Sequence, residues 1–145
     1  MSVVQITTEI TVPRTVVEEK LSPEAIVRYN EPWTLKSAEE SDGKTVLTVF
    51  SEQFDDVKLE FTQHSNGYSF RQVGENGPFE EMETKIELAG EEQTVIAITS
   101  EFTFGGRFER IKNWLGKTVR REELEQLLRN LVLDAAEGRI EPTET

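Results

Sequence analysis

The chain has 145 residues, a length typical of one domain with a sizeable core. Its formal net charge of −12 argues against nucleic acid as a partner, since phosphate binding needs surplus Lys and Arg. The absence of cysteine excludes disulfides, thiol chemistry and cysteine-ligated zinc, and no stretch approaches the ~20 apolar residues that span a bilayer.

The acidic charge is unevenly distributed along the chain. Residues 107–145 hold 8 basic and 8 acidic residues, so residues 1–106 hold 8 basic and 20 acidic ones. A high-salt cytoplasm is one explanation, because acidic surfaces keep proteins soluble there. An ordinary acidic protein is the other, and the excess of Glu over Asp, 24 to 4, favours it. The N-terminus has no basic region, so we expect no signal peptide and a cytoplasmic protein.

The first elements in chain order are a strand and two short helices. Residues 3–12 alternate between apolar and polar side chains, which is the period of a half-buried strand, and Pro13 ends it. Residues 14–20 predict a short helix. Ser22 is the N-cap of a second helix, with a proline at its first position, and this helix should end before Pro32.

A meander of six strands follows. The candidate strands are residues 33–40, 44–53, 57–65, 68–73, 79–88 and 93–104. Asp42-Gly43 and Asn66-Gly67 are strong signals for two-residue hairpin turns. Together with the first strand this gives seven strands, and the tight turns imply an antiparallel order.

The last quarter of the chain predicts a long helix, which starts after Gly105-Gly106 and is closed by Gly138. We expect a kink or a short break near Gly116-Lys117-Thr118, because glycine in a helix costs about 1 kcal/mol relative to alanine. Such a helix must lie across the sheet, since neither element buries its apolar face alone. The apolar positions of the helix are Phe108, Ile111, Leu115, Val119, Leu124, Leu127, Leu128, Leu131 and Ala135.

This order of elements resembles the helix-grip fold of the START and polyketide-cyclase/dehydrase superfamily. The resemblance is carried by Val12-Pro13 leading into Val16-Val17 and Leu21-Ser22-Pro23-Glu24, and by Gly105-Gly106-Arg107-Phe108 leading into residues 124–131. It implies an α+β fold in which a seven-stranded antiparallel sheet wraps around a long C-terminal helix, with two short helices between strands 1 and 2. We expect one domain over residues 1–138 and a disordered tail over residues 139–145.

The resemblance also implies a cavity between the sheet and the terminal helix. Strand alternation and the helix stripe then give a set of candidate ligand-binding residues, mostly apolar with a few hydroxyls and amides. The alternative is that these side chains simply fill a core. The candidates are Phe61, Gln63, Tyr68, Phe70, Met82, Thr84, Ile98, Ser100, Phe102, Ile111, Leu115 and Leu128.

The ionisable residues identify no catalytic group and no metal site. His64, the single histidine, is expected on the surface, and Arg71 is expected to pair with a cross-strand Glu on the outer face. A basic cluster at the start of the terminal helix either attracts an anionic headgroup or offsets the acidic sheet, and the second is favoured. Its members are Arg107, Arg110, Lys112, Lys117, Arg120 and Arg121.

The leading functional hypothesis is non-enzymatic binding or carriage of a small hydrophobic molecule, such as a lipid, an isoprenoid quinone or a polyketide-like aromatic. It involves no cofactor, no metal and no integral membrane association, and it leaves the oligomeric state open. A cyclase, dehydratase or aromatase using the same cavity is one alternative, and it requires polar groups that converge inside the pocket. A cochaperone-like interaction module is the other, and it requires a filled core with an exposed apolar patch around Trp33 and Trp114.

Overall fold

The computed structural model describes residues 2–30, 33–52, 54–74, 77–104 and 113–139. The element order is the predicted one, and every strand and short helix begins and ends within two residues of its predicted bounds. Among the described residues, no helix is both long and apolar enough to cross a membrane. The elements are β1 (Ser2–Ile10), α1 (Arg14–Lys20), α2 (Pro23–Tyr29), β2 (Thr34–Ser41), β3 (Lys44–Ser51), β4 (Asp55–His64), β5 (Gly67–Val73), β6 (Phe79–Ala89), β7 (Thr94–Phe104) and α3 (Asn113–Arg139).

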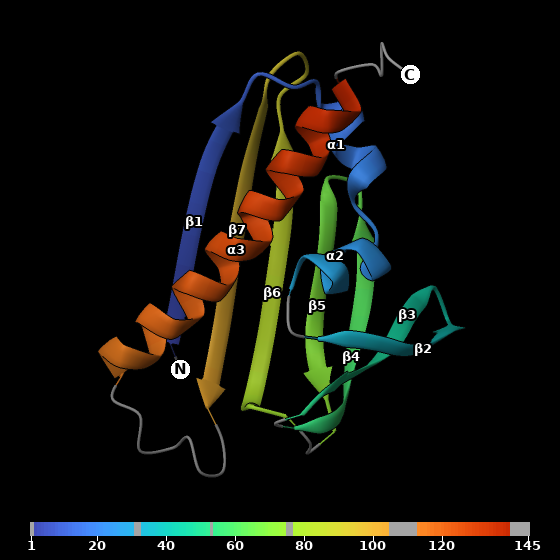
Figure 1. The fold of residues 1–145 in the computed structure, drawn as a ribbon, viewed down its shortest axis with the longest axis vertical. Coiled ribbons are helices and arrows are strands. Elements are labelled where there is room, and N and C mark those ends of the chain that lie inside the picture. Colours follow the sequence, from blue (N-terminus) through green and yellow to red (C-terminus); the bar gives the residue numbers. More distant parts are fainter. Residues whose placement is uncertain (1, 31–32, 53, 75–76, 105–112, 140–145) are drawn as a thin grey trace.

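The strands form one antiparallel sheet in the order β1-β7-β6-β5-β4-β3-β2. Figure 1 shows α3 crossing the sheet diagonally, with α1 and α2 on the same face beside it. The turn between β2 and β3 has positive φ at Asp42 (51°) and Gly43 (76°), as a two-residue hairpin with the predicted Asp-Gly pair requires. One face of the sheet is therefore covered by helices, and the space between the layers holds the core.

The start of α2 follows directly from its sequence. Ser22 Oγ accepts a hydrogen bond from the Ala25 backbone N–H at 3.1 Å, and Pro23 occupies the first turn, where its missing N–H leaves no donor unpaired. Ile26 and Val27 are buried on the sheet side of this helix. The cap and the proline thus fix where α2 begins, and its apolar residues fix which face it buries.

The α3 helix is continuous through Gly116, so a break in the helix at this glycine, one of the two predicted possibilities, is wrong. Gly116 is itself buried, and the helix gains more from packing this face than it loses in glycine propensity. Leu124, Leu127 and Leu131 are completely buried, as the predicted stripe requires. Val119, in contrast, is 41% exposed.

Polar contacts hold α2 against the second half of α3. The Tyr29 hydroxyl donates to Asp134 Oδ2 at 2.5 Å, and Asn130 Nδ2 donates to the Tyr29 carbonyl at 2.9 Å. Burial, followed by the Asp134 carboxylate, raises the pKa of the Tyr29 phenol well above its usual value of 10.0. The neutral phenol is therefore the form that links the two helices.

Candidate ligand pocket

A pocket of about 40 Å³ lies between the sheet and the two helices α2 and α3. About 10–15 Å³ is needed to hold one water, so the pocket has room for a few waters. Most of its wall is apolar or aromatic, with Asn30, Gln72 and Arg120 as the polar members. The wall consists of Ile26, Val27, Asn30, Trp33, Val57, Leu59, Phe61, Phe70, Gln72, Pro78, Phe79, Met82 and Arg120.

Aromatic rings form the sheet side of the pocket. Phe61 on β4 is paired with Phe70 on β5, and their rings stack with centroids 5.0 Å apart. Phe79 projects from the start of β6, and its backbone is held by Gln72, which donates from Nε2 to the Phe79 carbonyl at 2.7 Å. Gln72 Oε1 also accepts from the Phe79 N–H at 3.3 Å. The ring of Phe79 is thus positioned by a side chain of the neighbouring strand.

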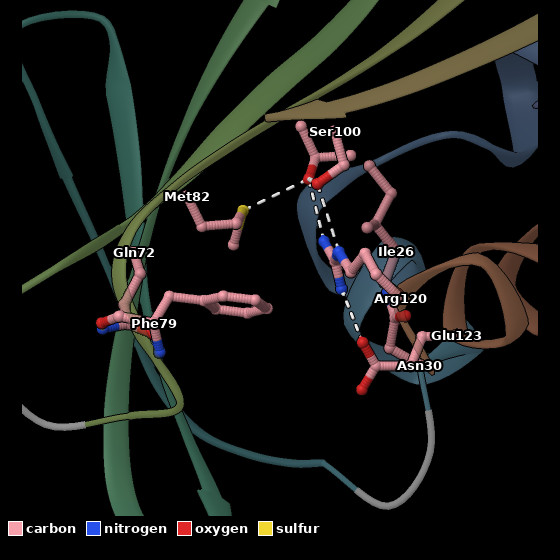
Figure 2. Close-up of polar contacts among 9 residues, drawn as sticks. Ile26, Asn30, Gln72, Phe79, Met82, Ser100, Arg120 and Glu123 are labelled. Atoms are coloured by element: carbon pink, nitrogen blue, oxygen red, sulfur yellow. Dashed lines mark hydrogen bonds and ion pairs between the residues drawn. The ribbon is translucent and has the colours of Figure 1, made fainter. Parts of the chain in front are cut away.

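Arg120 brings a buried positive charge to this apolar space. It lies on α3, is only 6% exposed and faces Phe79 and Met82 (Figure 2). Its Nε donates to Ser100 Oγ at 3.1 Å, and its Nη2 donates to Thr84 Oγ1 at 2.9 Å. The guanidinium carbon lies 5.1 Å from the centroid of the Phe79 ring, within cation–π distance.

The two hydroxyls that accept from Arg120 also contact each other. Thr84 on β6 is the register partner of Ser100 on β7, and their hydroxyl oxygens are 2.9 Å apart. Thr84 Oγ1 donates to Met82 Sδ at 3.2 Å, which leaves Ser100 to donate to Thr84. Without the arginine, the Ser100–Thr84 and Thr84–Met82 hydrogen bonds would therefore remain.

Glu123 completes the polar group at the edge of the pocket. Arg120 Nη1 donates to Glu123 Oε1 at 3.1 Å, one helical turn away, and the Glu123 side chain is 47% exposed. Burial lowers the pKa of the Arg120 guanidinium, and the Glu123 carboxylate raises it in part. Arginine stays protonated in proteins, so the site holds a buried cation whose carboxylate partner reaches solvent.

The structure brings together five of the predicted ligand-binding residues. Phe61, Phe70 and Met82 line the pocket, while Thr84 and Ser100 lie behind it as the acceptors of Arg120. All five are inward-facing strand residues, as strand alternation predicted.

Other predicted residues lie elsewhere. Ile98 and Phe102 are part of the core, and Leu128 packs against it. Gln63 and Tyr68 instead line a separate hollow near the Asp42-Gly43 turn. Ile111 is outside the described residues, and the Leu115 side chain is likewise not described.

Arg120 is absent from the predicted ligand-binding residues because its charge grouped it with the basic cluster at the start of the terminal helix. Among the described members of that cluster, Lys117 and Arg121 are exposed, but Arg120 is buried. A signal was present: Arg120 precedes Leu124 by four residues, so the apolar stripe of α3 extended by one turn reaches it. Asn30 and the α2 residues were missed because alternation within strands says nothing about which helix residues face the sheet. Trp33, predicted in an exposed patch, is instead partly buried and lines the pocket.

The outer face of the sheet is polar. Arg71 Nε contacts Glu60 Oε1 at 2.9 Å, so the predicted cross-strand pair is confirmed, and this contact lowers the pKa of Glu60. His64 is exposed, as predicted, and its Nε2 lies 2.7 Å from Ser69 Oγ. An open hollow of about 800 Å³ here is lined mainly by charged and polar side chains. It is larger than the inner pocket, but it lacks a continuous apolar wall that would exclude water.

Comparison with known proteins gives matches at the level of structure. No family model and no curated protein matches the sequence. An aromatase/cyclase, Zhui from Streptomyces sp. R1128, is 18% identical with a TM-score of 0.63, covering 94% of this chain and 93% of its own. A START superfamily protein from Mycobacterium smegmatis is 16% identical with a TM-score of 0.64, covering 97% of both chains.

A third match is norcoclaurine synthase from Thalictrum flavum, solved as a point mutant in complex with a transition-state analogue. It is 17% identical with a TM-score of 0.59, covering 92% of this chain and 94% of its own. These identities are too low to carry an activity across, but the coverage is nearly complete in all three cases. The chain therefore has the helix-grip fold of START-like proteins and aromatase/cyclases, and the expected resemblance is confirmed at the level of the fold.

Proposed function

We propose that this protein binds a small, largely apolar ligand in the pocket between the sheet, α2 and α3. The observation that carries the proposal is the composition of the pocket wall, which is aromatic and aliphatic with a few convergent polar groups. Similarity to an aromatase/cyclase and to a synthase solved in complex with a transition-state analogue supports it, because the second shows a protein of similar fold with a small molecule bound.

The pocket must widen to take such a ligand. Ligand pockets typically measure about 300–1,000 Å³, far more than the space present here. Three wall residues are suited to move: Trp33 and Leu59 are only partly buried, and Met82, although buried in the core, is unbranched and adaptable. We therefore propose that the ligand displaces these three side chains and so enlarges the pocket between the sheet, α2 and α3.

Binding of the neutral fluorescent probe N-phenyl-1-naphthylamine tests the proposal. Leu59→Trp, which adds bulk to the pocket wall, should weaken binding of the probe at least about tenfold. Leu133→Trp, on the exposed side of α3, should leave it unchanged. Equal affinities in both variants, or no saturable binding by the parent protein, would contradict the proposal, provided that circular dichroism shows both variants folded.

A second candidate function is catalysis of the cyclase or dehydratase kind. It is favoured by the juxtaposition of Arg120, which can stabilise negative charge developing on a carbonyl oxygen, with the Glu123 carboxylate, which can accept a proton from the adjacent carbon. Deuterium exchange at the α-carbon of an aryl 1,3-diketone, followed by NMR, tests this. An enzyme accelerates the exchange and loses that acceleration in Glu123→Gln, whereas a binding protein leaves the exchange at the rate of buffer.

The interaction-module alternative receives less support. The nearly filled pocket agrees with it, but the exposed large apolar side chains among the described residues are Val3, Leu35, Val119 and Leu133. They lie on β1, on β2 and at two places on α3 about four turns apart. These four side chains are scattered, which is ordinary for a protein surface. Of the two residues in the predicted patch, Trp33 is partly buried, and the Trp114 side chain lies outside the described part of the chain.

A further inference from the structure

The buried hydroxyls beside Arg120 do not need the arginine to satisfy their hydrogen bonds, so we expect Arg120 to add little to the stability of the fold. The hydroxyls of Thr84 and Ser100 are satisfied by each other and by Met82. A buried charge carries a large desolvation penalty, and an apolar residue of similar volume often replaces it without loss of stability. The position also lies on the apolar stripe of α3, where Leu124 and Leu127 follow it. Fold stability therefore does not explain why a charged residue occupies this position, and a role in binding would.

The guanidinium retains hydrogen-bonding capacity toward the pocket. An arginine carries five N–H donors, and Arg120 uses three of them among the described residues: Nε to Ser100, Nη2 to Thr84 and Nη1 to Glu123. One N–H on each Nη therefore has no acceptor in the described part of the chain. Because Arg120 lines the pocket, an acceptor located there is able to take these donors.

The carboxylate partner of Arg120 is the one that can leave. The Glu123 side chain is half exposed, so it is able to exchange its contact with Nη1 for water at little cost. Thr84 and Ser100, both completely buried, would continue to hold the other edge of the guanidinium. A ligand anion can thus replace Glu123 while the sheet keeps Arg120 oriented.

We infer that the pocket selects an apolar organic acid, whose anionic oxygens bind Arg120 in place of Glu123 while its apolar body lies against the aromatic wall. This inference rests on the proposed function and adds a ligand class to it. Charge-assisted contacts with a guanidinium in a water-excluded site are among the stronger hydrogen bonds in proteins, and two parallel N–H···O contacts fit a carboxylate. Arg120 is accordingly the residue that distinguishes an acid from its neutral analogue.

The test is competition by an isosteric pair, 2-naphthoate and 2-naphthamide, against bound N-phenyl-1-naphthylamine at neutral pH. We expect the parent protein to prefer the naphthoate by about tenfold or more. Arg120→Met should abolish the preference while retaining the neutral probe, and Arg129→Met, at an exposed position on the same helix, should keep it. Glu123→Gln should raise the affinity for naphthoate severalfold, because the competing carboxylate is gone.

The possible results distinguish a failure of acid selectivity from a failure of ligand binding itself. If the neutral probe binds but naphthoate and naphthamide compete equally, or if the preference survives Arg120→Met, the inference is overturned and the pocket remains a binding site. A loss of naphthoate affinity in Glu123→Gln overturns it as well, and does so independently of the arginine variant. If the neutral probe does not bind the parent protein at all, the proposed function itself fails.

Discussion

The two halves of α3 face the same sheet with opposite chemistry. Between Leu124 and Ala135 the stripe is apolar throughout: Leu124, Leu127, Leu131 and Ala135 are completely buried and Leu128 is partly buried, so this half, called the dry half below, belongs to the core. One turn earlier, the same stripe holds Arg120, and the sheet opposite supplies Thr84 and Ser100 in place of aliphatic side chains. The dry half stabilises the fold through burial, and the charged half is the part of the helix to which we assign the proposed binding. Figure 2 shows the charged half.

The largest effect should come from the dry half. Leu127→Ala removes a completely buried side chain from the packed stripe and should destabilise the protein by about 2–5 kcal/mol, through lost burial and the cavity left behind. Leu133→Ala, at a position 56% exposed on the same helix, is the matched control and should change the free energy of unfolding by less than about 0.5 kcal/mol. Urea unfolding measures both. A small effect of Leu127→Ala would remove the distinction between the two halves.

A smaller effect is expected where α2 is held against the dry half. Tyr29→Phe removes the hydrogen bond to Asp134 and should cost about 1 kcal/mol in urea unfolding at neutral pH. The pKa of Tyr29 is raised in the folded state, so its contribution is fully present below the unfolded value of 10.0 and is lost as pH rises above it. The parent protein should therefore lose stability more steeply than Tyr29→Phe above pH 10. Parallel pH curves for the two proteins would show that the phenol is not coupled to folding.

The charged half should give the smallest effect on stability. Arg120→Met leaves the Thr84–Ser100 pair intact and frees Glu123 to solvent, so the free energy of unfolding should stay level or rise by up to about 2 kcal/mol. Arg129→Met serves as the control for loss of a positive charge from α3. A destabilisation of several kcal/mol by Arg120→Met alone would show that the buried charge is a structural element.

The sequence predicted the fold well, because the signals for it are local. Alternation along the strands, the Asp42-Gly43 turn and the Ser22-Pro23 helix start each fix an element without reference to the others. Their order then leaves few topologies in which both the sheet and the long helix bury an apolar face. The helix-grip arrangement follows from these constraints.

The site was predicted only in part, because it depends on contacts between elements. Strand parity correctly placed Phe61, Phe70 and Met82 on the inner face, but it cannot say which helix turn lies above them. Arg120 was predicted only as one member of a basic cluster that offsets the acidic sheet, although its spacing from Leu124 pointed inward. A charged residue in phase with an apolar stripe is thus a better indicator of a site than a run of like charges.

We propose that an apolar ligand enters the pocket between the sheet, α2 and α3, and does not enter the core beneath the dry half of α3. Methyl-detected NMR during titration with N-phenyl-1-naphthylamine tests it most directly. We predict shifts for the methyl groups of Ile26, Val27, Val57 and Leu59, which line the pocket. We predict none for those of Leu127 and Leu131 in the dry half, or for Val17 on α1, which packs against α3. Equal shifts in both sets of methyl groups, or shifts confined to the outer face of the sheet, would contradict the account.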